Sequence, residues 1–419
     1  MRFLSGEFFQ RVIRVFLGTL GAQAITIGSM LVLVRLYSPA EMGHFNVWIS
    51  FVTIGVVVAT GRYELAMFAI KSEHEARDLV KLIGHVAFWF ALASGGVLFV
   101  LDWMSDMAPV AVVSFLPALV VAIFFMALQK TFGNVLVLHR QFSRLGLSRL
   151  AAAASVALLQ FAGAWVLSGS AGLIYGQTLG IMLGTALLLM LIDRQWLASC
   201  MKGKRRAMWR AARQYAQFPK FSLPSDLINT LVSQLPLILM SSRYGADVVG
   251  WYGMTTRAMA APISLLSNSV LDVFKEQAAR DYREKGNCRD IYRRTFITLA
   301  LIALPPFAAL WLFSEVLFGF VFGEAWRQSG VYARLLIPMF YMGFIASPLG
   351  YTIYIAQKQH YDLAWQIGAL MVALASFLLP STPERSIGIF SISYAGMYAI
   401  YLAMSYYFSR NPKGSASTK

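Results

Sequence analysis

The segment RQWLASCMKGKRRAMWRAARQYAQFPKFSLP, residues 194–224, divides the chain into two halves of similar length. It contains no Asp or Glu, and its basic residues are Arg194, Lys202, Lys204, Arg205, Arg206, Arg210, Arg213 and Lys220. A long series of apolar runs lies on either side of it. Because a connection this cationic stays on the cytoplasmic side of a membrane, it fixes the orientation of everything around it.

The composition of the chain is that of a polytopic membrane protein. Of its 419 residues, 58% are hydrophobic and 13% are charged, whereas soluble domains carry about 25% charged residues. The net charge of +16 comes from short basic segments between apolar runs, which excludes the single interleaved patch expected of a nucleic-acid partner. Two cysteines and five scattered histidines form no zinc or redox motif, so we expect no metal and no cofactor.

The apolar runs predict an all-α protein with about twelve transmembrane helices in two six-helix lobes. The predicted domains are an amino-terminal lobe, 1–193, a basic cytoplasmic linker, 194–221, and a carboxy-terminal lobe, 222–419. The expected spans are roughly 14–35, 44–70, 83–101, 110–129, 148–167, 172–192, 222–242, 249–273, 294–322, 331–355, 363–380 and 387–408.

Most Lys and Arg residues lie on one side of this topology. With twelve spans both termini share the cytoplasmic side, and the opposite side receives only Arg35, Arg243, Arg327, Arg334 and Arg385. The loops on that opposite side are all short, so they leave no room for an external catalytic domain. We therefore expect a protein that is not an enzyme and that acts within its helices or at its cytoplasmic face.

An internal repeat supports the division into halves. RLYSPAEMGHF, residues 35–45, follows the first expected helix, and RYGADVVGWY, residues 243–252, follows the seventh. Both segments contain an Arg, a Tyr, a short acidic turn and a Gly, and an aromatic residue lies one or two positions after that Gly. Their equivalent places in the two halves indicate a parallel repeat.

Two arginines fall inside the apolar runs. Arg62 precedes Glu64 in GRYELAMFAI, near the cytoplasmic end of the second expected helix, where Arg62 either snorkels to the interface or faces a polar cavity. Residues two apart on one helix point to different faces, so we expect no pairing of these two within that helix. Arg257 lies roughly 8 Å below the aromatic pair Trp251 and Tyr252. A guanidinium at that depth is expected to face water or an anion.

Two acids and a set of prolines complete the candidates. Asp226 follows Pro224, and favourable interaction with the amino terminus of a helix explains its presence. Asp272 is explained by pairing with the neighbouring Lys275. Together with Glu64, these two acids are the candidate residues for binding a coupling ion. Prolines inside the second half predict kinked helices, from irregular packing or around a central site. Gly176, Gly180 and Gly184, spaced by four, predict close helix packing.

Four motifs resemble those of the polysaccharide transporter family, the Wzx-type lipid-linked oligosaccharide flippases. They are RLYSPAEMG (35–43), GRYELA (61–66), YAQFPKFSLPSDLIN (215–229) and FGEAW (322–326). The resemblance implies the fold of the multidrug and toxin extruders, with two lobes around a central cavity. It also implies a cationic cavity that attracts a pyrophosphate; by position Arg62 and Arg257 would fill that role, and Arg35 and Arg243 would serve the exit side.

The function implied by this resemblance is a flippase in the bacterial cytoplasmic membrane. Its cargo would be an undecaprenyl-pyrophosphate-linked oligosaccharide for O-antigen or exopolysaccharide assembly, moved by alternating access among membrane lipids and near a polymerase and other assembly proteins. One alternative is a multidrug-type cation antiporter of the same fold, which needs buried acids. Another is a membrane-embedded polysaccharide polymerase or glycosyltransferase, which needs a large external loop or paired acids. The sugar, the coupling ion and the oligomeric state are not determined by the sequence.

Overall fold

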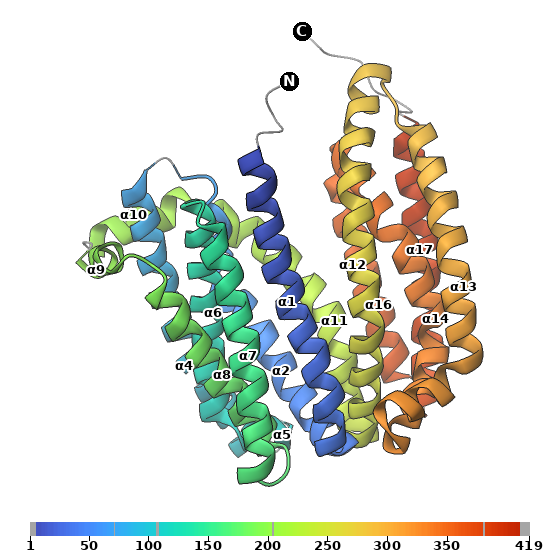
Figure 1. Ribbon diagram of the computed structural model, residues 1–419, viewed down its shortest axis with the longest axis horizontal. Helices are drawn as coiled ribbons and strands as arrows, with labels where there is room; N and C mark the ends of the chain where they lie inside the picture. The colour runs from blue at the N-terminus through green and yellow to red at the C-terminus, as the bar shows by residue number, and fades with distance from the viewer. Residues whose placement is uncertain (1–5, 71, 106–108, 203–204, 380–381, 411–419) are drawn as a thin grey trace. The chain divides into compact units, whose positions relative to one another are not determined.

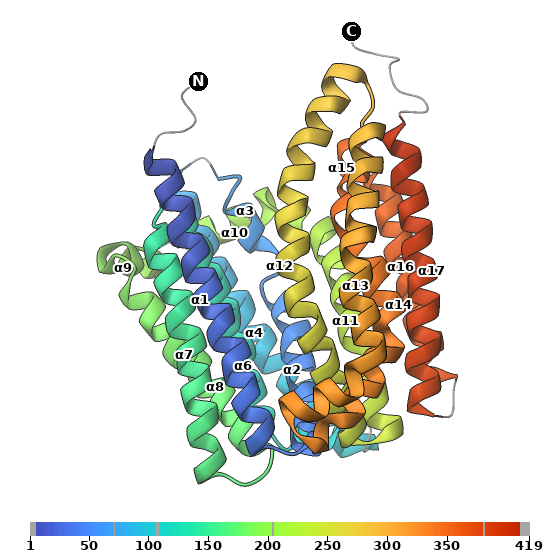
Figure 2. The ribbon, with the colours of Figure 1, turned by 45° about the vertical axis from the view of Figure 1, so that its right-hand side comes forward.

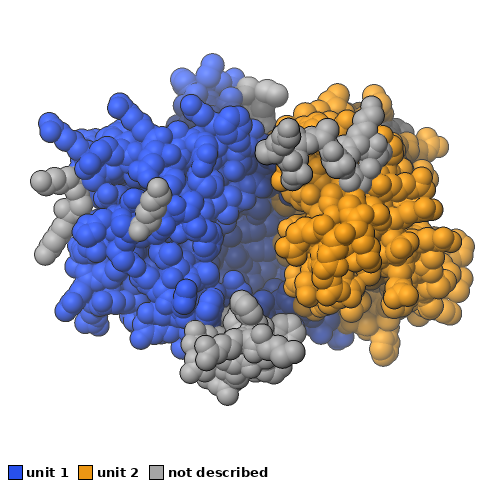
Figure 3. Space-filling model, turned by 90° about the horizontal axis from the view of Figure 1, so that it is seen from above, with its two compact units in different colours: residues 1–230 blue, residues 231–419 orange. Residues whose placement is uncertain are grey.

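The computed structural model describes residues 6–70, 72–105, 109–202, 205–379 and 382–410. These residues fold into helices joined by turns, and no strand occurs among them. The chain forms two compact units, unit 1 up to Thr230 and unit 2 from Leu231 onwards (Figure 3). The basic segment 194–221 belongs to unit 1. The chain ends, for which a cytoplasmic position is predicted, lie outside the described residues.

Unit 1 contains six long helices and several short ones (Figure 1). Its elements are α1 (Gly6–Leu36), α2 (Pro39–Ala59), α3 (Tyr63–Ala66), α4 (Glu73–Ser105), α5 (Val110–Val113), α6 (Leu116–Leu138), α7 (Phe142–Val166), α8 (Ala171–Met190), α9 (Arg194–Lys202), α10 (Arg205–Gln214) and a π-helical turn (Phe218–Ser222), followed by α11 (Leu223–Tyr244), which continues into unit 2.

Helices α7 and α8 approach each other more closely than side chains would allow. A Cβ atom built on Gly180 would lie 2.5 Å from the Cα of Val156, and one built on Gly176 would lie 2.7 Å from the Cα of Gln160. Gly184 is similarly close to Ala152. The predicted close packing along these glycines is therefore confirmed, with α1 packed on the other side of α7.

The motif at residues 35–43 forms the connection between α1 and α2 and the first turn of α2. Ser38 and Glu41 form a capping box at the beginning of α2, in which the Ser38 amide donates to Glu41 Oε2 at 2.7 Å and the Glu41 amide donates to Ser38 Oγ at 3.3 Å. The hydroxyl of Tyr37 donates to the carbonyl of Gln160 on α7 at 3.0 Å. The motif therefore fixes where α2 begins and ties the α1–α2 connection to α7.

The basic segment is not an extended linker, because α9 and α10 pack against α4 at one end of unit 1 (Figure 1). Met208 and Ala211 of α10 are buried. The Tyr215 hydroxyl donates to Glu75 Oε2 at 2.6 Å; burial, together with this carboxylate, raises the pKa of Tyr215 to about 12. The indole of Trp196 donates to Glu73 Oε2 at 2.9 Å. The arginines of the segment are thereby held on a folded surface.

Unit 2 contains the remaining helices (Figure 2). They are α12 (Ala246–Lys285), α13 (Arg289–Phe322), a 3-10 turn (Glu324–Trp326), α14 (Arg327–Leu349), α15 (Tyr351–Ile355), α16 (Gln359–Leu378) and α17 (Pro383–Ser409). Helix α14 lies at the centre, where it packs against α12, α13 and α17.

The core of unit 2 forms where α12, α13 and α14 meet. Phe274, Leu299 and Phe344 are buried there. The FGEAW motif makes the turn between α13 and α14: Gly323 has a φ of 104°, which favours glycine, and Trp326 is buried. Prolines lie inside the helices of this unit, and the helices continue past Pro236, Pro262, Pro305, Pro306 and Pro338, whereas α14 ends one residue after Pro348.

Among the described residues, eleven segments are long and apolar enough to cross a membrane. They correspond to eleven of the twelve expected spans. The expected eighth span lies in α12, which has forty residues but carries Arg257 and acidic residues that make it less apolar than the others. The length and apolar composition of these segments are those of a multi-pass membrane protein.

Both cysteines are free. Cys200 is buried in unit 1 and Cys288 in unit 2. Burial raises the pKa of the Cys200 thiol to about 11.

Candidate functional site

A break after α2 creates a charged interior region in unit 1. Helix α2 ends at Ala59, and Gly61 and Arg62 then adopt left-handed backbone conformations with φ of 54° and 57°. Such a conformation costs a non-glycine residue about 1–2 kcal/mol, so surrounding contacts must hold Arg62 in place. The expected continuous helix over 44–70 is therefore wrong, because α3 is a separate short helix beginning at Tyr63.

The break brings Arg62 and Glu64 together. Arg62 Nη1 lies 3.1 Å from Glu64 Oε1, and the other guanidinium nitrogen, Nη2, pairs with Asp226 Oδ2 at the start of α11. Lys130 Nζ, from α6, lies 2.8 Å from the same Glu64 Oε1. We call these four residues the charged cluster. The prediction that Arg62 and Glu64 cannot pair is wrong, because it assumed an unbroken helix.

The charged cluster is buried at its centre. The side chain of Glu64 is 0% exposed, compared with 15% for Arg62, 33% for Asp226 and 37% for Lys130. The side-chain amide of Asn134 also donates to the Glu64 carbonyl at 3.0 Å, which fastens α3 to α6. A buried carboxylate needs such compensation, because its desolvation is costly without nearby cations and donors.

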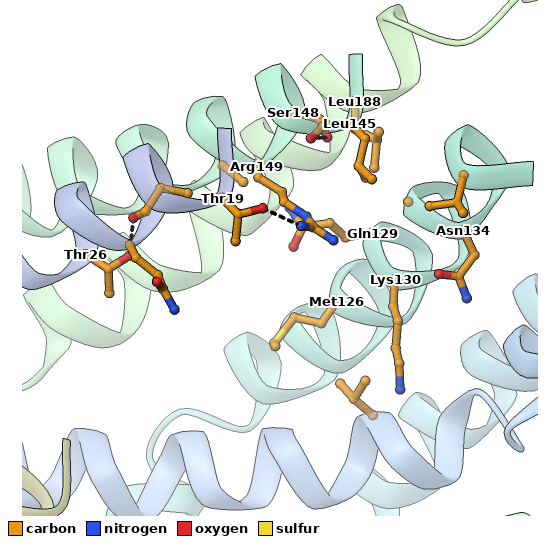
Figure 4. Close-up of a pocket in the computed structure, with 16 residues that line it drawn as sticks. Thr19, Thr26, Met126, Gln129, Lys130, Asn134, Leu145, Ser148, Arg149 and Leu188 are labelled. Carbon is orange, nitrogen blue, oxygen red and sulfur yellow. Dashed lines mark hydrogen bonds between the residues drawn. The ribbon is translucent and has the colours of Figure 1, made fainter. Parts of the chain in front are cut away.

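Beside the charged cluster lies a polar pocket of about 530 Å³, formed by α1, α2, α6, α7 and α8 (Figure 4). Among its described lining residues, the charged ones are Lys130 and Arg149, both cations. Arg149 Nη1 donates to Thr19 Oγ1 at 2.7 Å. Lys130 therefore belongs to both the charged cluster and the pocket.

Amide side chains add neutral polar groups to this pocket. Gln129 and Asn134 line it from α6, and Gln23 lines it from α1 (Figure 4 labels the first two). The side-chain oxygen of Gln23 is buried, and within the described part of the chain it has no hydrogen-bond partner. A buried acceptor of this kind is available to a ligand hydroxyl or amide. The pocket thus combines cations with groups that can bind uncharged polar ligands.

Sequence reasoning missed Lys130 and Arg149 as site residues. Lys130 follows the expected fourth span, which ends at residue 129, and Arg149 lies at the start of the expected fifth span, 148–167, so both count as charges of the cytoplasmic side. In the structure α6 continues to Leu138 and α7 begins at Phe142. The apolar spacing that resumes after Lys130, at Val135 and Leu136, carried the information that the helix continues.

The other predicted arginines lie elsewhere. Arg35 is exposed in the last turn of α1, sixteen residues and therefore about 24 Å along the helix from Thr19 of the pocket. Arg257 is exposed on α12, between the buried Met254 and Met259. It belongs to unit 2 and does not line the polar pocket of unit 1.

Arg243 has a structural role. Its Nη1 donates to the carbonyl of Phe377 at 2.8 Å and also to the carbonyl of Leu378, the last residues of α16. A cation that donates to the final carbonyls of a helix stabilises that helix end. The neighbouring Tyr244 bonds to Ser386 of α17 at 2.7 Å, much as Tyr37 bonds to α7 in the corresponding connection of unit 1.

Of the three acids considered for coupling, two belong to the charged cluster. Glu64 and Asp226 meet there through Arg62. Asp272 lies apart on α12, where its side chain is 79% exposed and 3.6 Å from Lys275. Among the described residues, no group of three or more His, Cys, Asp or Glu side chains is arranged to hold a metal ion.

The sequence of the chain is similar to those of known proteins. Residues 32–330 match the model of a family described as polysaccharide biosynthesis protein. The teichuronic acid biosynthesis protein TuaB of Bacillus subtilis (strain 168) is 22% identical over 202 residues, which are 48% of this chain and 41% of that protein. The match therefore spans less than half the length of this relative.

Solved structures share the fold. The lipid II flippase MurJ in an inward closed conformation gives a TM-score of 0.72 at 12% identity, covering 95% of this chain and 90% of that one. An inward-facing MATE family multidrug resistance transporter of the MOP superfamily gives 0.66 at 11% identity, covering 93% and 94%. Since the family match covers more than half of the chain, this protein belongs to the polysaccharide biosynthesis protein family and has the MurJ- and MATE-like fold.

Proposed function

We propose that this protein is a flippase that moves a lipid-linked oligosaccharide across the bacterial cytoplasmic membrane by alternating access. One observation carries the proposal: in a member of this family, a polar pocket between membrane-spanning helices is lined by two cations, Lys130 and Arg149. Charged side chains are rare in such helices, and where they occur they usually mark the path of a substrate or ion.

The chemistry of the pocket suits a phosphate attached to a sugar. Lys130 and Arg149 provide charge-assisted donors for phosphate oxygens, and Arg149 has the planar fork that matches them. Gln23, Gln129 and Asn134 provide acceptors and donors for sugar hydroxyls. The proposed cargo is an undecaprenyl-pyrophosphate-linked oligosaccharide used for O-antigen or exopolysaccharide assembly, which the protein moves without chemical change.

The arginines that the sequence singled out are proposed to act in different ways. Arg257, exposed on α12, is proposed as an additional phosphate contact. Arg62 is engaged by two carboxylates, so its contribution would pass through the charged cluster. Arg35 and Arg243 are proposed to serve the exit side, although the Arg243 guanidinium already caps α16.

Glu64 and Asp226 are the proposed coupling residues, because an anion that binds Lys130 competes with Glu64 for the same ammonium group. Asp272 is the weaker candidate, since it lies outside this cluster. Both termini are proposed to be cytoplasmic, and a polysaccharide polymerase and other assembly proteins are the proposed partners.

The test is the leaflet in which the cargo accumulates. In cells lacking this protein, lipid-linked oligosaccharide is expected to collect in the inner leaflet, and the wild-type chain should relieve this. Losing one charge-assisted contact costs about 1.5–3 kcal/mol, so Arg149→Ala should lower the rescue by roughly 10-fold or more. Arg149→Lys should retain part of it.

Arg210→Ala is the matched control, because Arg210 is exposed on α10 outside the pocket. It should rescue as well as the wild type. Full rescue by Arg149→Ala would remove the pocket from the proposal. Transport of cationic drugs in place of the oligosaccharide would favour the antiporter alternative, for which the MATE-like fold is the supporting observation.

A further inference from the structure

Unit 1 contains a second, apolar cavity on the other side of α6. Its volume is about 790 Å³, within the roughly 300–1,000 Å³ range of small-molecule sites. It is bounded by α4, α6, the end of α8 and α9, and we call it the α4–α9 groove. Among its described lining residues none is acidic, and the titratable ones are Lys81, His85 and Cys200.

The walls of the groove are suited to a hydrocarbon chain. Phe88 of α4 and Phe124 of α6 meet edge to face, with their ring centroids 5.9 Å apart. Leu128 and Phe132 continue the wall along α6. Cys200 closes the groove from α9, where burial raises the pKa of its thiol to about 11. An apolar cavity of this size within a membrane protein favours occupation by an acyl chain.

The groove has a cationic end. Lys81 and His85 lie one turn apart on α4, and His85 Nδ1 is 2.9 Å from the Lys81 carbonyl oxygen, which holds the imidazole ring. The neighbouring helix α9 begins with Arg194, and Asp193 just before it accepts a hydrogen bond from the Gln195 amide at 3.0 Å. Neither Asp193 nor Arg194 lines the groove, so its basic groups are Lys81 and His85. This end therefore attracts the phosphate of a lipid whose chain lies between the phenylalanines.

The groove and the polar pocket use opposite faces of α6. Lys130 and Asn134 line the pocket, whereas Leu128 and Phe132 line the groove. At about 100° per residue, the two sets point roughly 180° apart. The helix separates the two spaces, so a lipid in the groove is distinct from a cargo head group in the pocket.

We propose that the α4–α9 groove binds one anionic phospholipid of the surrounding bilayer, with an acyl chain along Phe88, Phe124 and Leu128 and its phosphate at Lys81 and His85. The bound lipid supports the back of α6, the helix that carries Lys130 on its opposite face. This inference concerns a lipid other than the cargo, so it stands whether or not the protein is a flippase.

Gly84 provides a direct test. It lines the groove, and a Cβ atom built on it would meet no atom within 4 Å, so a larger side chain extends into open space. Gly96, three turns further along α4, is equally open but lies outside the groove. Gly84→Leu and Gly96→Leu are therefore a matched pair that make the same change in one helix.

The measurement is lipid retention by the purified full-length protein, titrated with phosphatidylglycerol or phosphatidylcholine and followed by native mass spectrometry. The wild type and Gly96→Leu should retain one phosphatidylglycerol. Gly84→Leu should retain roughly 10-fold less. Lys81→Gln, which leaves the apolar walls intact, should bind both lipids equally and serves as the second variant if Gly84→Leu does not fold.

Three results would overturn the proposal. The first is equal retention of phosphatidylglycerol by Gly84→Leu and Gly96→Leu, which would place the lipid elsewhere. The second is no preference of the wild type for phosphatidylglycerol over phosphatidylcholine. The third is displacement of phosphatidylglycerol by undecaprenyl phosphate at equal concentration, which would assign the groove to the cargo lipid.

Discussion

Unit 1 and unit 2 treat the charges and breaks in their helices differently. In unit 1 the chain interrupts a helix at Gly61 and Arg62 and uses the interruption to bury Glu64 between Arg62 and Lys130. In unit 2 the helices run through their prolines, Arg243 caps a neighbouring helix, and Arg257 stays exposed. One unit assembles a charged interior, and the other keeps long helices that prolines can bend.

The buried acids of the two units show the same contrast. Glu64 in unit 1 is compensated by two cations. Asp362 in unit 2 accepts hydrogen bonds from the neutral groups of Tyr354, Tyr401 and Gln366, at 2.8–2.9 Å. Two units of one fold can therefore satisfy a buried carboxylate by different means. In unit 1 the arrangement is also connected to a polar pocket, because Lys130 lines that pocket.

The largest expected effect is that of Glu64→Gln, which removes the compensating charge from the cluster. We expect the free energy of unfolding to fall by roughly 3 kcal/mol, at the low end for broken buried pairs because Lys130 and Arg62 keep partial exposure. Denaturant unfolding of the purified protein measures this. Asp272→Asn, an exposed change in unit 2, should leave it within about 0.5 kcal/mol; equal effects would erase the contrast between the units.

Arg257→Ala tests the charge of unit 2 by function. Because Arg257 is partly accessible to solvent, its replacement should lower stability less than Glu64→Gln does. Rescue of oligosaccharide transport should nevertheless fall by roughly 10-fold if the guanidinium contacts phosphate. Retained transport would confine the cationic site to unit 1, and Arg257→Lys, which keeps the charge, should rescue at least in part.

Tyr401→Phe sharpens the comparison of the two acids. It removes one neutral donor from Asp362, and two donors remain, so we expect a loss of about 1 kcal/mol in unfolding free energy. Tyr407→Phe is the matched change at a side chain that is 55% exposed, and it should have no measurable effect. A loss near that of Glu64→Gln would mean that both acids depend on their partners alike.

The smallest effect belongs to Arg243→Ala. Loss of the cap on α16 should cost roughly 0.3–1 kcal/mol. Arg327→Ala, at an exposed pair with Glu324, is the control and should cost less. A large loss of transport with unchanged stability would show that Arg243 contacts the cargo in addition to its structural role.

The sequence predicted the helical membrane fold well, because its information is carried by runs of apolar residues and by basic segments. The glycine spacing on α8 also predicted its close packing against α7. The end of α2 was not predicted, because it depends on the left-handed conformation of Arg62. The ion pair of Arg62 with Asp226, which lies far away in the sequence, helps to hold that conformation, and no local pattern reveals it.

The site was harder to predict for the same reason. In the sequence Lys130 follows an apolar run, as a basic residue of a cytoplasmic loop does. It lines the polar pocket because α6 continues past it to Leu138. The meeting of Arg62, Lys130 and Asp226 joins three segments that are far apart in the sequence. Predictions based on depth within one helix can identify an unusual charge, but they do not identify its partners.

The glycine contacts between α7 and α8 have a practical consequence for following motion in this protein. Two helices whose backbones touch at Gly176 and Gly180 have no side-chain layer that can slide or repack. Spectroscopic labels on their outer surfaces would define a fixed baseline, against which the displacement of any other helix during a transport cycle can be read.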